Sequence, residues 1–411
     1  MTEQPKTPTG KISIAFVNSI FLRRDAISNT LHDRVQFAAA HRDLFDYKVF
    51  CYASDYPTLN VEIVRNAGDI IQSPDFRNAD IVVVEFGIYH DLFDVVLCET
   101  RAAKLVSYHN VTSSWLFEPG DKRQLCERSE AQGWNLAFAD FVVCNSRFTL
   151  EQAKAYGVDL SRTRVIAPSV PATGGWRVEK DPDGPVVLLC VGRLVAQKGI
   201  LDLVKALEIL SHVELPAWRL HVVGAMKFSD PAYVRLLRRE IEDAGLQDCV
   251  HFLGELDETE IRRAFAQAHV LAAPSHHEGF GVPVIEGLAS GCVVVCSDAG
   301  ALPEVAGEFG NIYPCGDRRA LAKLLIRVLS DLRPRQGEAK YRVGARVLSE
   351  AEYYAAAEAY VAPFLPKTAV AEFYGVVRDL VAQKRGAEIA DPPEHPGQSV
   401  LGLTGDLAAC R

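Results

Sequence analysis

Several features that would mark other classes of protein are absent from this 411-residue sequence. No run of about 18 apolar residues occurs, so we expect no membrane-spanning helix. The net charge is −9, which argues against broad nucleic-acid binding, because such proteins usually carry a basic surface. The ten cysteines include no Cys-x-x-Cys pair, so neither zinc binding nor dithiol chemistry is supported.

Motifs for several common chemistries are also missing. The sequence has no His-Glu-x-x-His zinc motif and no phosphate loop ending in Gly-Lys-Ser/Thr. The first apolar run continues as FVNSIFLRRD, without the Gly-x-Gly-x-x-Gly pattern that a nicotinamide-dependent dehydrogenase would carry there. The one Asp-x-Asp, at Asp181 and Asp183, does not follow an apolar run. We therefore expect neither a catalytic metal nor any other cofactor.

Short apolar runs alternate with amphipathic stretches of helical period through most of the sequence. In the first half the runs cover residues 12–17, 47–52, 81–86, 105–109, 141–145 and 164–167. In the second half they cover residues 186–191, 220–223, 250–253, 270–273 and 293–297. Strands rich in Val and Ile that alternate with helices predict parallel sheets buried on both faces. Two such series predict an α/β protein with two Rossmann-like, doubly wound domains.

The same pattern divides the chain into five parts. Residues 1–170 form the predicted first domain, residues 171–185 a linker rich in Gly, Pro and charge, and residues 186–348 the second domain. Residues 349–385 are predicted to be helical, with apolar residues at three- and four-residue steps. That stripe suits a helix that returns to pack on the first domain, or less readily one that lies on a membrane surface. Residues 386–411 show little pattern and are predicted to be a disordered tail.

The segment APSHHEGFGVPVIEGLASG, residues 273–291, carries the clearest functional signal. A Gly-rich turn leads into a predicted helix, with Pro283 at its first position and Gly291 at its C-terminal cap. Four consecutive backbone N–H groups would lie at the helix N-terminus and favour a phosphate, those of Gly279, Phe280, Gly281 and Val282. Glu278 and Glu286 frame the turn, and a carboxylate can accept hydrogen bonds from two vicinal hydroxyls. Either glutamate alone would more often be a solvated charge, but the whole constellation predicts a binding site.

A second cluster opens the same domain. The run PVVLLCVGRLVAQKG places Arg193 and Lys198 after the carboxyl end of a predicted strand, where ligands bind in open α/β sheets. Two cations and a helix N-terminus can balance the charge of a departing nucleoside diphosphate without a divalent metal.

These motifs, together with AGALPEVAG at residues 299–307, resemble the donor-binding signature of glycosyltransferase family 4. The resemblance covers most of residues 186–317 and implies a GT-B fold, in which two Rossmann-like domains face each other across a cleft. It implies that Glu286 holds the ribose of the nucleotide. It also implies that Glu278 and the amides after it contact the donor sugar, and that Arg193 and Lys198 grip the diphosphate.

The first domain carries the segment SYHNVT, residues 107–112, at the end of an apolar run. A His at the end of a parallel strand faces the cleft, although from composition alone an exposed loop His without a role is equally compatible. The segment is similar to the Tyr-His-Asn-Ile-Thr motif of a family subgroup that includes bacterial polysaccharide and lipopolysaccharide glycosyltransferases. That similarity implies that His109 lies beside the reacting sugar and supports the transition state.

The loop after the first apolar run resembles the first loop of the same subgroup, with a departure. The family often has Gly where this chain has Arg24 and Ser28, so close approach of the backbone to a phosphate is less well supported. Candidate contacts to an anionic acceptor or to phosphate in this loop are Arg23, Arg24, Asp25 and Ser28.

The sequence thus predicts a retaining, metal-independent glycosyltransferase of polysaccharide, lipopolysaccharide or glycoconjugate synthesis. Its expected partners are a GDP- or UDP-linked sugar donor and a sugar or lipid-linked glycan acceptor. Two alternatives stay open: a nucleotide-sugar epimerase of the same fold, and a catalytically silent nucleotide-sugar-binding protein. Residues 1–10 do not resemble a signal peptide. We therefore expect a cytoplasmic location, with at most peripheral contact with the inner face of a membrane.

Overall fold

The computed structural model describes residues 10–23, 25–170, 180–181, 183–225, 227, 229–333 and 338–386. The N-terminal half is built on a seven-stranded sheet in which neighbouring strands run parallel. The strands are β1 (Ile12–Val17), β2 (Phe45–Cys51), β3 (Val61–Ile63), β4 (Ile81–Phe86), β5 (Ala103–Tyr108), β6 (Phe141–Cys144) and β7 (Thr163–Val165). Their order is β3-β2-β1-β4-β5-β6-β7, so the winding of the chain reverses between β1 and β4.

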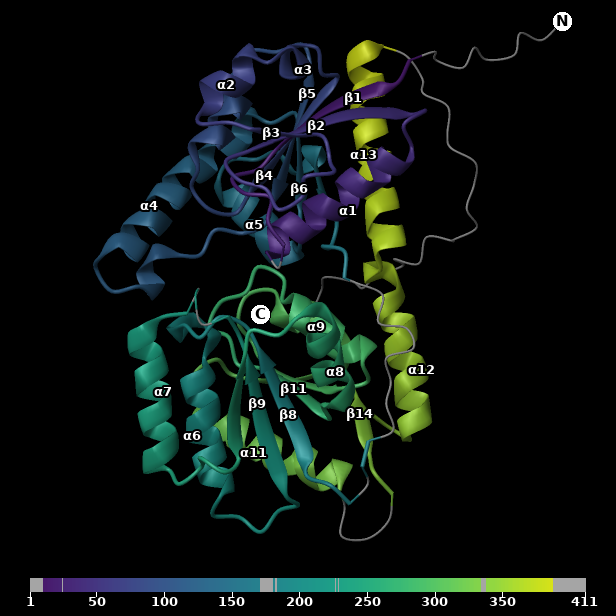
Figure 1. The fold of residues 1–411 in the computed structure, drawn as a ribbon. Helices are drawn as coiled ribbons and strands as arrows, with labels where there is room; N and C mark the ends of the chain where they lie inside the picture. Colours follow the sequence, from purple (N-terminus) through teal and green to yellow (C-terminus); the bar gives the residue numbers. More distant parts are fainter. Residues whose placement is uncertain are drawn as a thin grey trace, which may run out of the picture.

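Helices cover both faces of this sheet, because its central strands bury side chains on each side. One face packs against α1 (Ala26–Ala40), which begins after Asp25, whose carboxylate accepts a hydrogen bond from the amide of Ser28. The other face packs against α2 (Ala67–Gln72), α3 (Pro74–Arg77), α5 (Arg147–Ala155), and the 3-10 segments η1 (Asp91–Leu97) and η3 (Trp134–Phe138). The segment η2 (Ser114–Leu116) leads into α4 (Asp121–Gly133), which projects to the left in Figure 1. A last 3-10 segment, η4 (Leu160–Arg162), precedes β7.

The C-terminal half is built on a second parallel sheet, with six strands. The strands are β8 (Val186–Val191), β9 (Trp218–Val223), β10 (Val250–Gly254), β11 (Val270–Ala273), β12 (Val293–Ser297) and β13 (Gly310–Tyr313). Their order is β10-β9-β8-β11-β12-β13, and the winding reverses between β8 and β11. The two doubly wound parallel sheets predicted from the sequence are therefore confirmed.

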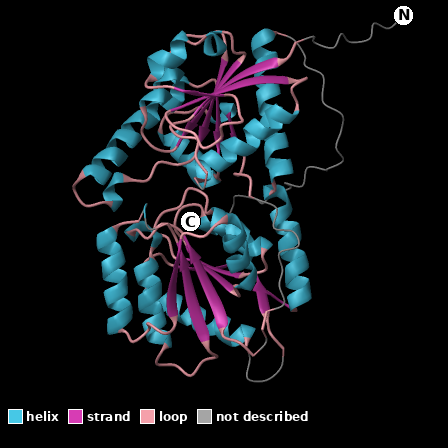
Figure 2. Cartoon of the chain, viewed as in Figure 1, coloured by secondary structure: helices cyan, strands magenta, loops and turns pink. Residues whose placement is uncertain are grey.

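Helices also surround the second sheet, and Figure 2 shows the two halves stacked one above the other. They are α6 (Ile200–Leu210), α7 (Pro231–Asp243), α8 (Glu258–Gln267), α9 (Val282–Ala289), α10 (Leu302–Ala306), α11 (Arg318–Leu332) and α12 (Glu350–Val361). Shorter elements are the 3-10 segments η5 (Ala196–Lys198), η7 (Gly307–Phe309) and η8 (Ala362–Phe364), and the antiparallel hairpin of β14 (Tyr341–Val343) and β15 (Arg346–Leu348). Buried side chains from these helices and from the sheet form one core.

The final helix, α13 (Pro366–Arg385), leaves the C-terminal half and packs on the first sheet, as its yellow ribbon shows in Figure 1. Its buried residues, among them Phe373 and Val377, belong to the same cluster as Leu31 and Val35 of α1. The hydroxyl of Tyr374 donates to the carbonyl of Arg34 at 2.6 Å. The described part of the chain contains no helix long and apolar enough to span a bilayer. Residues 171–179 of the predicted linker and residues 387–411 of the predicted tail lie outside the described residues.

Candidate functional site

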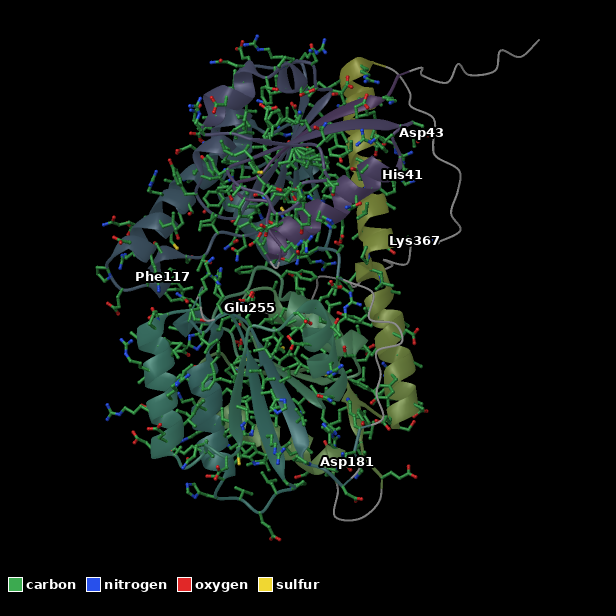
Figure 3. The ribbon with its side chains drawn as sticks, viewed as in Figure 1. His41, Asp43, Phe117, Asp181, Glu255 and Lys367 are labelled. Atoms are coloured by element: carbon green, nitrogen blue, oxygen red, sulfur yellow. The ribbon has the colours of Figure 1, made fainter. Side chains whose placement is uncertain are left out.

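The carboxyl edges of the two sheets meet at one seam. Segments after β5 of the first sheet touch segments after β11 of the second, since a Cβ added at Gly279 would lie 2.5 Å from Cβ of Asn110. In the second sheet, β8 and β11 flank the point where the winding reverses, which is where open α/β sheets bind ligands. Figure 3 labels one residue on each side of this seam, Phe117 above and Glu255 below.

The loops after β8 and β11 bring two of the predicted donor-site residues together. Lys198 forms an ion pair with Glu278, and the hydroxyl of Ser275 lies 3.2 Å from the same carboxylate oxygen. Both charged side chains are partly exposed, at 22% and 18%. They line a pocket with the backbone of Gly192 and Gly281. A cation and a carboxylate therefore sit at the carboxyl ends of the central strands, open to a ligand.

Glycines let these loops approach each other closely. Gly199 has a left-handed φ of +63°, and a Cβ there would lie 1.9 Å from the carbonyl oxygen of Pro274. Gly300, with φ +60°, packs on the backbone of Glu278, and the amide of Ala301 donates to the Glu278 carbonyl at 3.0 Å. Any side chain at either glycine would push the Lys198 loop or the Glu278 loop out of place.

The predicted helix after the Gly-rich turn is α9. It begins at Val282 after Gly281, whose φ of +94° suits glycine, so Pro283 occupies the second position rather than the first. Its N-terminal amides face the turn, as expected for an anion site. Phe280 contributes only backbone there, because its side chain is buried against Phe364. Gly291, with φ +76°, follows the C-terminal end at Ser290.

Glu286 lies one turn into α9. Burial raises its pKa to about 7, although the Arg262 guanidinium opposes the rise. Among the described residues, no side chain donates a hydrogen bond to its carboxylate. Arg193, by contrast, is exposed, and no described side chain pairs with its guanidinium. Glu286 is thus a carboxylate with unused acceptor capacity, and Arg193 is a cation free to meet an anion.

Across the seam, His109 follows β5, and its ring is held by a buried carboxylate. Its Nε2 lies 2.5 Å from Oε2 of Glu85, and Oε1 of Glu85 accepts from Nη1 of Arg34 at 2.8 Å. The His109 side chain is 8% exposed and that of Glu85 is fully buried. Burial pushes the pKa of Glu85 up, but Arg34 and His109 outweigh it and hold the pKa below its usual value.

The seam combines polar contacts with the packing of Phe148 of α5 against the core of the C-terminal half and against His277. Asn110 has a φ of 90°, and its Nδ2 donates to Nε2 of His277 at 2.8 Å, while its buried Oδ1 has no partner in the described structure. Burial lowers the pKa of His277, with smaller effects from Glu278 and Lys198. A strained, partly unsatisfied Asn at the meeting point of two loops is typical of a functional site.

Two further contacts join α5 to the C-terminal half. The hydroxyl of Ser146, which also caps α5, donates to the carbonyl of Gly279 at 2.7 Å. The carboxylate of Glu304 accepts from the first two amides of α5, those of Arg147 and Phe148, at 3.1 Å each. Glu304 therefore caps a helix of the opposite half, where the helix dipole favours negative charge.

The candidates in the first loop have different surroundings. Asp25 caps α1, and Ser28 is buried with its hydroxyl bonded to the carbonyl of Ile20 at 3.1 Å. Arg23 is exposed, and its guanidinium lies 5.8 Å from the ring centroid of Tyr56. Arg24 lies outside the described residues. Asp25 and Ser28 thus serve the loop itself, which leaves Arg23 as the described side chain of this group that is available to an acceptor.

Several residues of the site were not singled out from the sequence. They are Arg34, Glu85, Ser146, His277 and Glu304. A glutamate inside the apolar run IVVVEF was the one local signal, because a buried charge usually has a partner. Among the described residues, no cluster of three or more His, Cys, Asp or Glu side chains is placed to hold a metal.

Comparisons with known proteins show similarity to glycosyltransferases. Residues 176–343 match the family model described as "Glycosyl transferases group 1". Over 180 residues the chain is 34% identical to lipopolysaccharide core biosynthesis mannosyltransferase LpcC of Rhizobium leguminosarum bv. viciae, which covers 43% of this chain and 49% of the relative. The chain thus spans about half the length of this curated relative.

Solved structures show the fold. A glycosyltransferase of Rickettsia africae ESF-5 superimposes with a TM-score of 0.71 at 17% identity, covering 90% of this chain and 99% of the other. Anabaena Alr3699/HepE, solved in complex with UDP, gives 0.70 at 18% identity, covering 90% and 100%. The two facing sheets are therefore the GT-B fold that the sequence motifs implied, and that prediction is confirmed.

Proposed function

We propose that this protein, whose residues 176–343 match the family model of the group 1 glycosyltransferases, transfers a sugar from a nucleotide-diphosphate donor to a hydroxyl of a glycan acceptor. The observation that carries the proposal is the Lys198–Glu278 pair at the reversal point of the second sheet, facing His109 and Asn110 of the first. The C-terminal half supplies charged groups for a diphosphate, and the N-terminal half covers the site from the opposite side.

The donor roles follow from the chemistry of each group. Lys198 and the exposed Arg193 would neutralise the diphosphate, together with the amides at the N-terminus of α9. On binding, Lys198 would exchange part of its pairing with Glu278 for phosphate oxygens, which frees Glu278 to accept hydrogen bonds from the sugar. Glu286, which no described side chain hydrogen-bonds, would accept the two ribose hydroxyls.

His109 would act on the sugar from the acceptor side of the seam. It follows β5, and its neighbour Asn110 touches Gly279, so the imidazole is close to where the sugar of a bound donor would lie. We assign it hydrogen bonding to the sugar and stabilisation of the transition state. Arg23 is the described cation of the first loop that could meet an anionic acceptor.

The reaction proposed is transfer with retention of configuration and without a metal. The leaving phosphate would help to deprotonate the acceptor hydroxyl on the same face of the sugar. The protein would contribute positioning and electrostatic stabilisation. Two cations and a helix N-terminus supply the positive charge that a divalent ion supplies in other enzymes.

The donor proposed is a UDP- or GDP-linked sugar. The relative LpcC is named a mannosyltransferase, and the Anabaena protein was solved with UDP. The acceptor proposed is a sugar or a lipid-linked glycan of polysaccharide or lipopolysaccharide synthesis.

A donor panel tests the proposal. The full-length protein is mixed with UDP- and GDP-linked hexoses, with and without simple glycoside acceptors, and with and without EDTA. We expect one donor to raise the melting temperature, because a ligand at a hundredfold excess over Kd stabilises the folded state by about 2.7 kcal/mol. The same donor should release nucleoside diphosphate in EDTA, and the product should keep the anomeric configuration of the donor. Conversion of the donor alone into another nucleotide sugar would instead identify an epimerase, and binding without turnover with any acceptor would contradict an enzymatic role.

A further inference from the structure

A chain of buried polar side chains runs behind His109. Glu85, on β4, sits between the His109 ring and the Arg34 guanidinium of α1, with contacts of 2.5 and 2.8 Å. The exposed fractions of the Arg34 and Glu85 side chains are 4% and 0%. Burying two charges is costly, so such a pair is maintained only where its geometry is well satisfied.

The contact at Glu85 decides which ring nitrogen of His109 carries the proton. An ionised carboxylate can only accept hydrogen bonds, so Nε2 of His109 must be the protonated nitrogen when the ring is neutral. The ionised form of Glu85 is supported by its lowered pKa, since Arg34 and His109 outweigh the effect of burial. Among the described residues no group hydrogen-bonds to Nδ1. This leaves Nδ1 as the ring atom that can accept a hydrogen bond from a ligand.

Arg34 is itself fixed from three sides. Its Nη1 donates to the hydroxyl of Ser107 at 2.9 Å, and its guanidinium lies 4.0 Å from the ring centroid of Phe373. Its carbonyl accepts from the hydroxyl of Tyr374. Both aromatic residues belong to α13, the helix that returns from the C-terminal half. The side chain that orients Glu85 is therefore held by α13.

We infer that Glu85 is a positioning residue, which is held by Arg34 and fixes the ring of His109 with the proton on Nε2, so that Nδ1 accepts a hydroxyl of the donor sugar. The inference rests on the proposed function for the role of His109 in turnover. Its structural part, the position of the ring proton, can be tested without any substrate.

A second carboxylate in the chain has the same chemistry and provides a matched control. Asp202 accepts from Nε2 of His276 and from Nε of Arg318, each at 2.6 Å. This cluster is more open, because the His276 and Arg318 side chains are 36% and 48% exposed. It lies on the C-terminal half, so a change there should affect the ring of His276 but not that of His109.

The first test is NMR of the full-length protein labelled with ¹⁵N-histidine, in which the ring proton of each tautomer has its own pattern. The His109 signals are those missing from His109→Ala. We expect the wild-type ring to carry its proton on Nε2. In Glu85→Gln, the Arg34 guanidinium can only donate hydrogen bonds, so it should donate to the amide oxygen of the new Gln side chain. The amide NH₂ group would then face His109. Nε2 must then accept, and the proton should move to Nδ1.

The control and the contrary results are equally definite. Asp202→Asn should shift the His276 proton by the same logic and leave the His109 signals unchanged. A wild-type His109 ring with its proton on Nδ1 would overturn the inference. So would a ring that keeps its proton on Nε2 in Glu85→Gln.

The second test measures turnover of the most active nucleotide sugar of the donor panel. Glu85→Gln should lower kcat about tenfold to a hundredfold, the loss typical of carboxylates that orient metal-ligating histidines, with little change in donor KM. In a His109→Ala background the same substitution should have no further effect on kcat, because Glu85 acts through His109. An equal loss in both backgrounds would show a merely structural role and refute the inference.

Two further outcomes separate this inference from the proposed function. If no nucleotide sugar is turned over, the proposed function fails, while the NMR result still decides the tautomer. If Glu85→Gln does not fold because it leaves Arg34 buried without a counter-ion, Arg34→Met/Glu85→Gln removes both charges together. Its loss of kcat should likewise disappear in the His109→Ala background, and persistence of the loss would refute the role of Glu85.

Discussion

Replacing Gly279 with Ala should separate the two halves of the protein without removing any donor-binding group. Gly279 is a point where the C-terminal half packs directly against His109 and Asn110. A Cβ there would lie 2.5 Å from Cβ of Asn110 and 2.8 Å from the carbonyl oxygen of His109. The alanine keeps its backbone amide, so the N-terminus of α9 can still bind a phosphate.

The size of the effect follows from the overlap. The distance from the added Cβ to Cβ of Asn110 is about 0.9 Å less than the 3.4 Å at which ordinary van der Waals contact begins. A second neighbour, the carbonyl oxygen of His109, belongs to the backbone. Overpacking of this kind costs about 1–3 kcal/mol. That energy corresponds to about a 5- to 150-fold smaller population of the closed form, by which we mean the form in which the two halves are in contact at Gly279. The hydrogen bonds that Asn110 makes to His277 and that Gly279 accepts from Ser146 would weaken with it.

The assay combines kinetics with small-angle scattering. Gly279→Ala should lower kcat by a factor in this range and enlarge the radius of gyration, while binding of UDP or GDP alone stays close to that of the wild type. Gly375→Ala is the control, because Gly375 lies within α13 and has no atom within 4 Å of an added Cβ. It should leave kcat unchanged and slightly raise stability, by up to about 1 kcal/mol. A Gly279→Ala variant with wild-type kcat and scattering would show that the seam does not close as described.

Three other substitutions probe the donor site and the seam. The pKa of Glu286 is about 7 in the folded protein, against an ordinary value of 4.5. Ionisation of Glu286 therefore lowers the stability of the folded protein progressively as the pH rises through this range. Glu286→Gln should therefore have the same free energy of unfolding as the wild type at pH 4, and one up to about 3 kcal/mol higher at pH 8. A variant as stable as the wild type at both pH values would contradict the burial of this carboxylate. Lys198→Met should lower kcat/KM about 10²- to 10³-fold by removing the cation beside Glu278, whereas Lys205→Met, which breaks only pairs with Glu208 and Glu240, should have no such effect in the same assay. Glu304→Gln should lower kcat severalfold, since a charge at an exposed helix N-terminus contributes about 0.3–1 kcal/mol, and kcat equal to that of the wild type would show that this contact does not hold the halves together.

The sheets were predictable because each strand has a local signal. The runs predicted at residues 12–17, 81–86, 186–191, 270–273 and 293–297 coincide with β1, β4, β8, β11 and β12. Central parallel strands are apolar on both faces, so they form continuous runs of Val, Ile and Leu. Within the two parallel sheets the missed strands, β3 and β13, are short edge strands in which fewer side chains are buried, and the short hairpin of β14 and β15 was missed as well. Their pairing depends on neighbours rather than on their own sequence.

The donor side of the site was also largely visible in the sequence. Lys198, Glu278 and the amides after it lie on two loops of one half, and glycines at fixed positions mark where those loops touch. The acceptor side was visible only at His109. The groups that hold its ring come from other elements, since Glu85 precedes His109 by 24 residues and Arg34 precedes Glu85 by 51. The charge of Glu85 inside the apolar run IVVVEF indicates that it has a partner, but only the fold shows that this partner is Arg34.

The nature of the seam suggests how the two halves work together. The apolar cores are separate clusters, one in the C-terminal half and two in the N-terminal half, and α13 belongs to the latter. The described contacts that cross the seam near the site include single hydrogen bonds, such as Ser146 to Gly279 and Arg147 to Glu304, and the packing of Phe148 against the C-terminal core. Each such bond contributes about 1 kcal/mol. We therefore expect a donor that contacts Lys198 with its diphosphate and His109 with its sugar to favour the form in which the two halves are in contact. Closure would then be driven by the donor, and only the closed form would bring His109, with its ring proton fixed by Glu85, against the sugar.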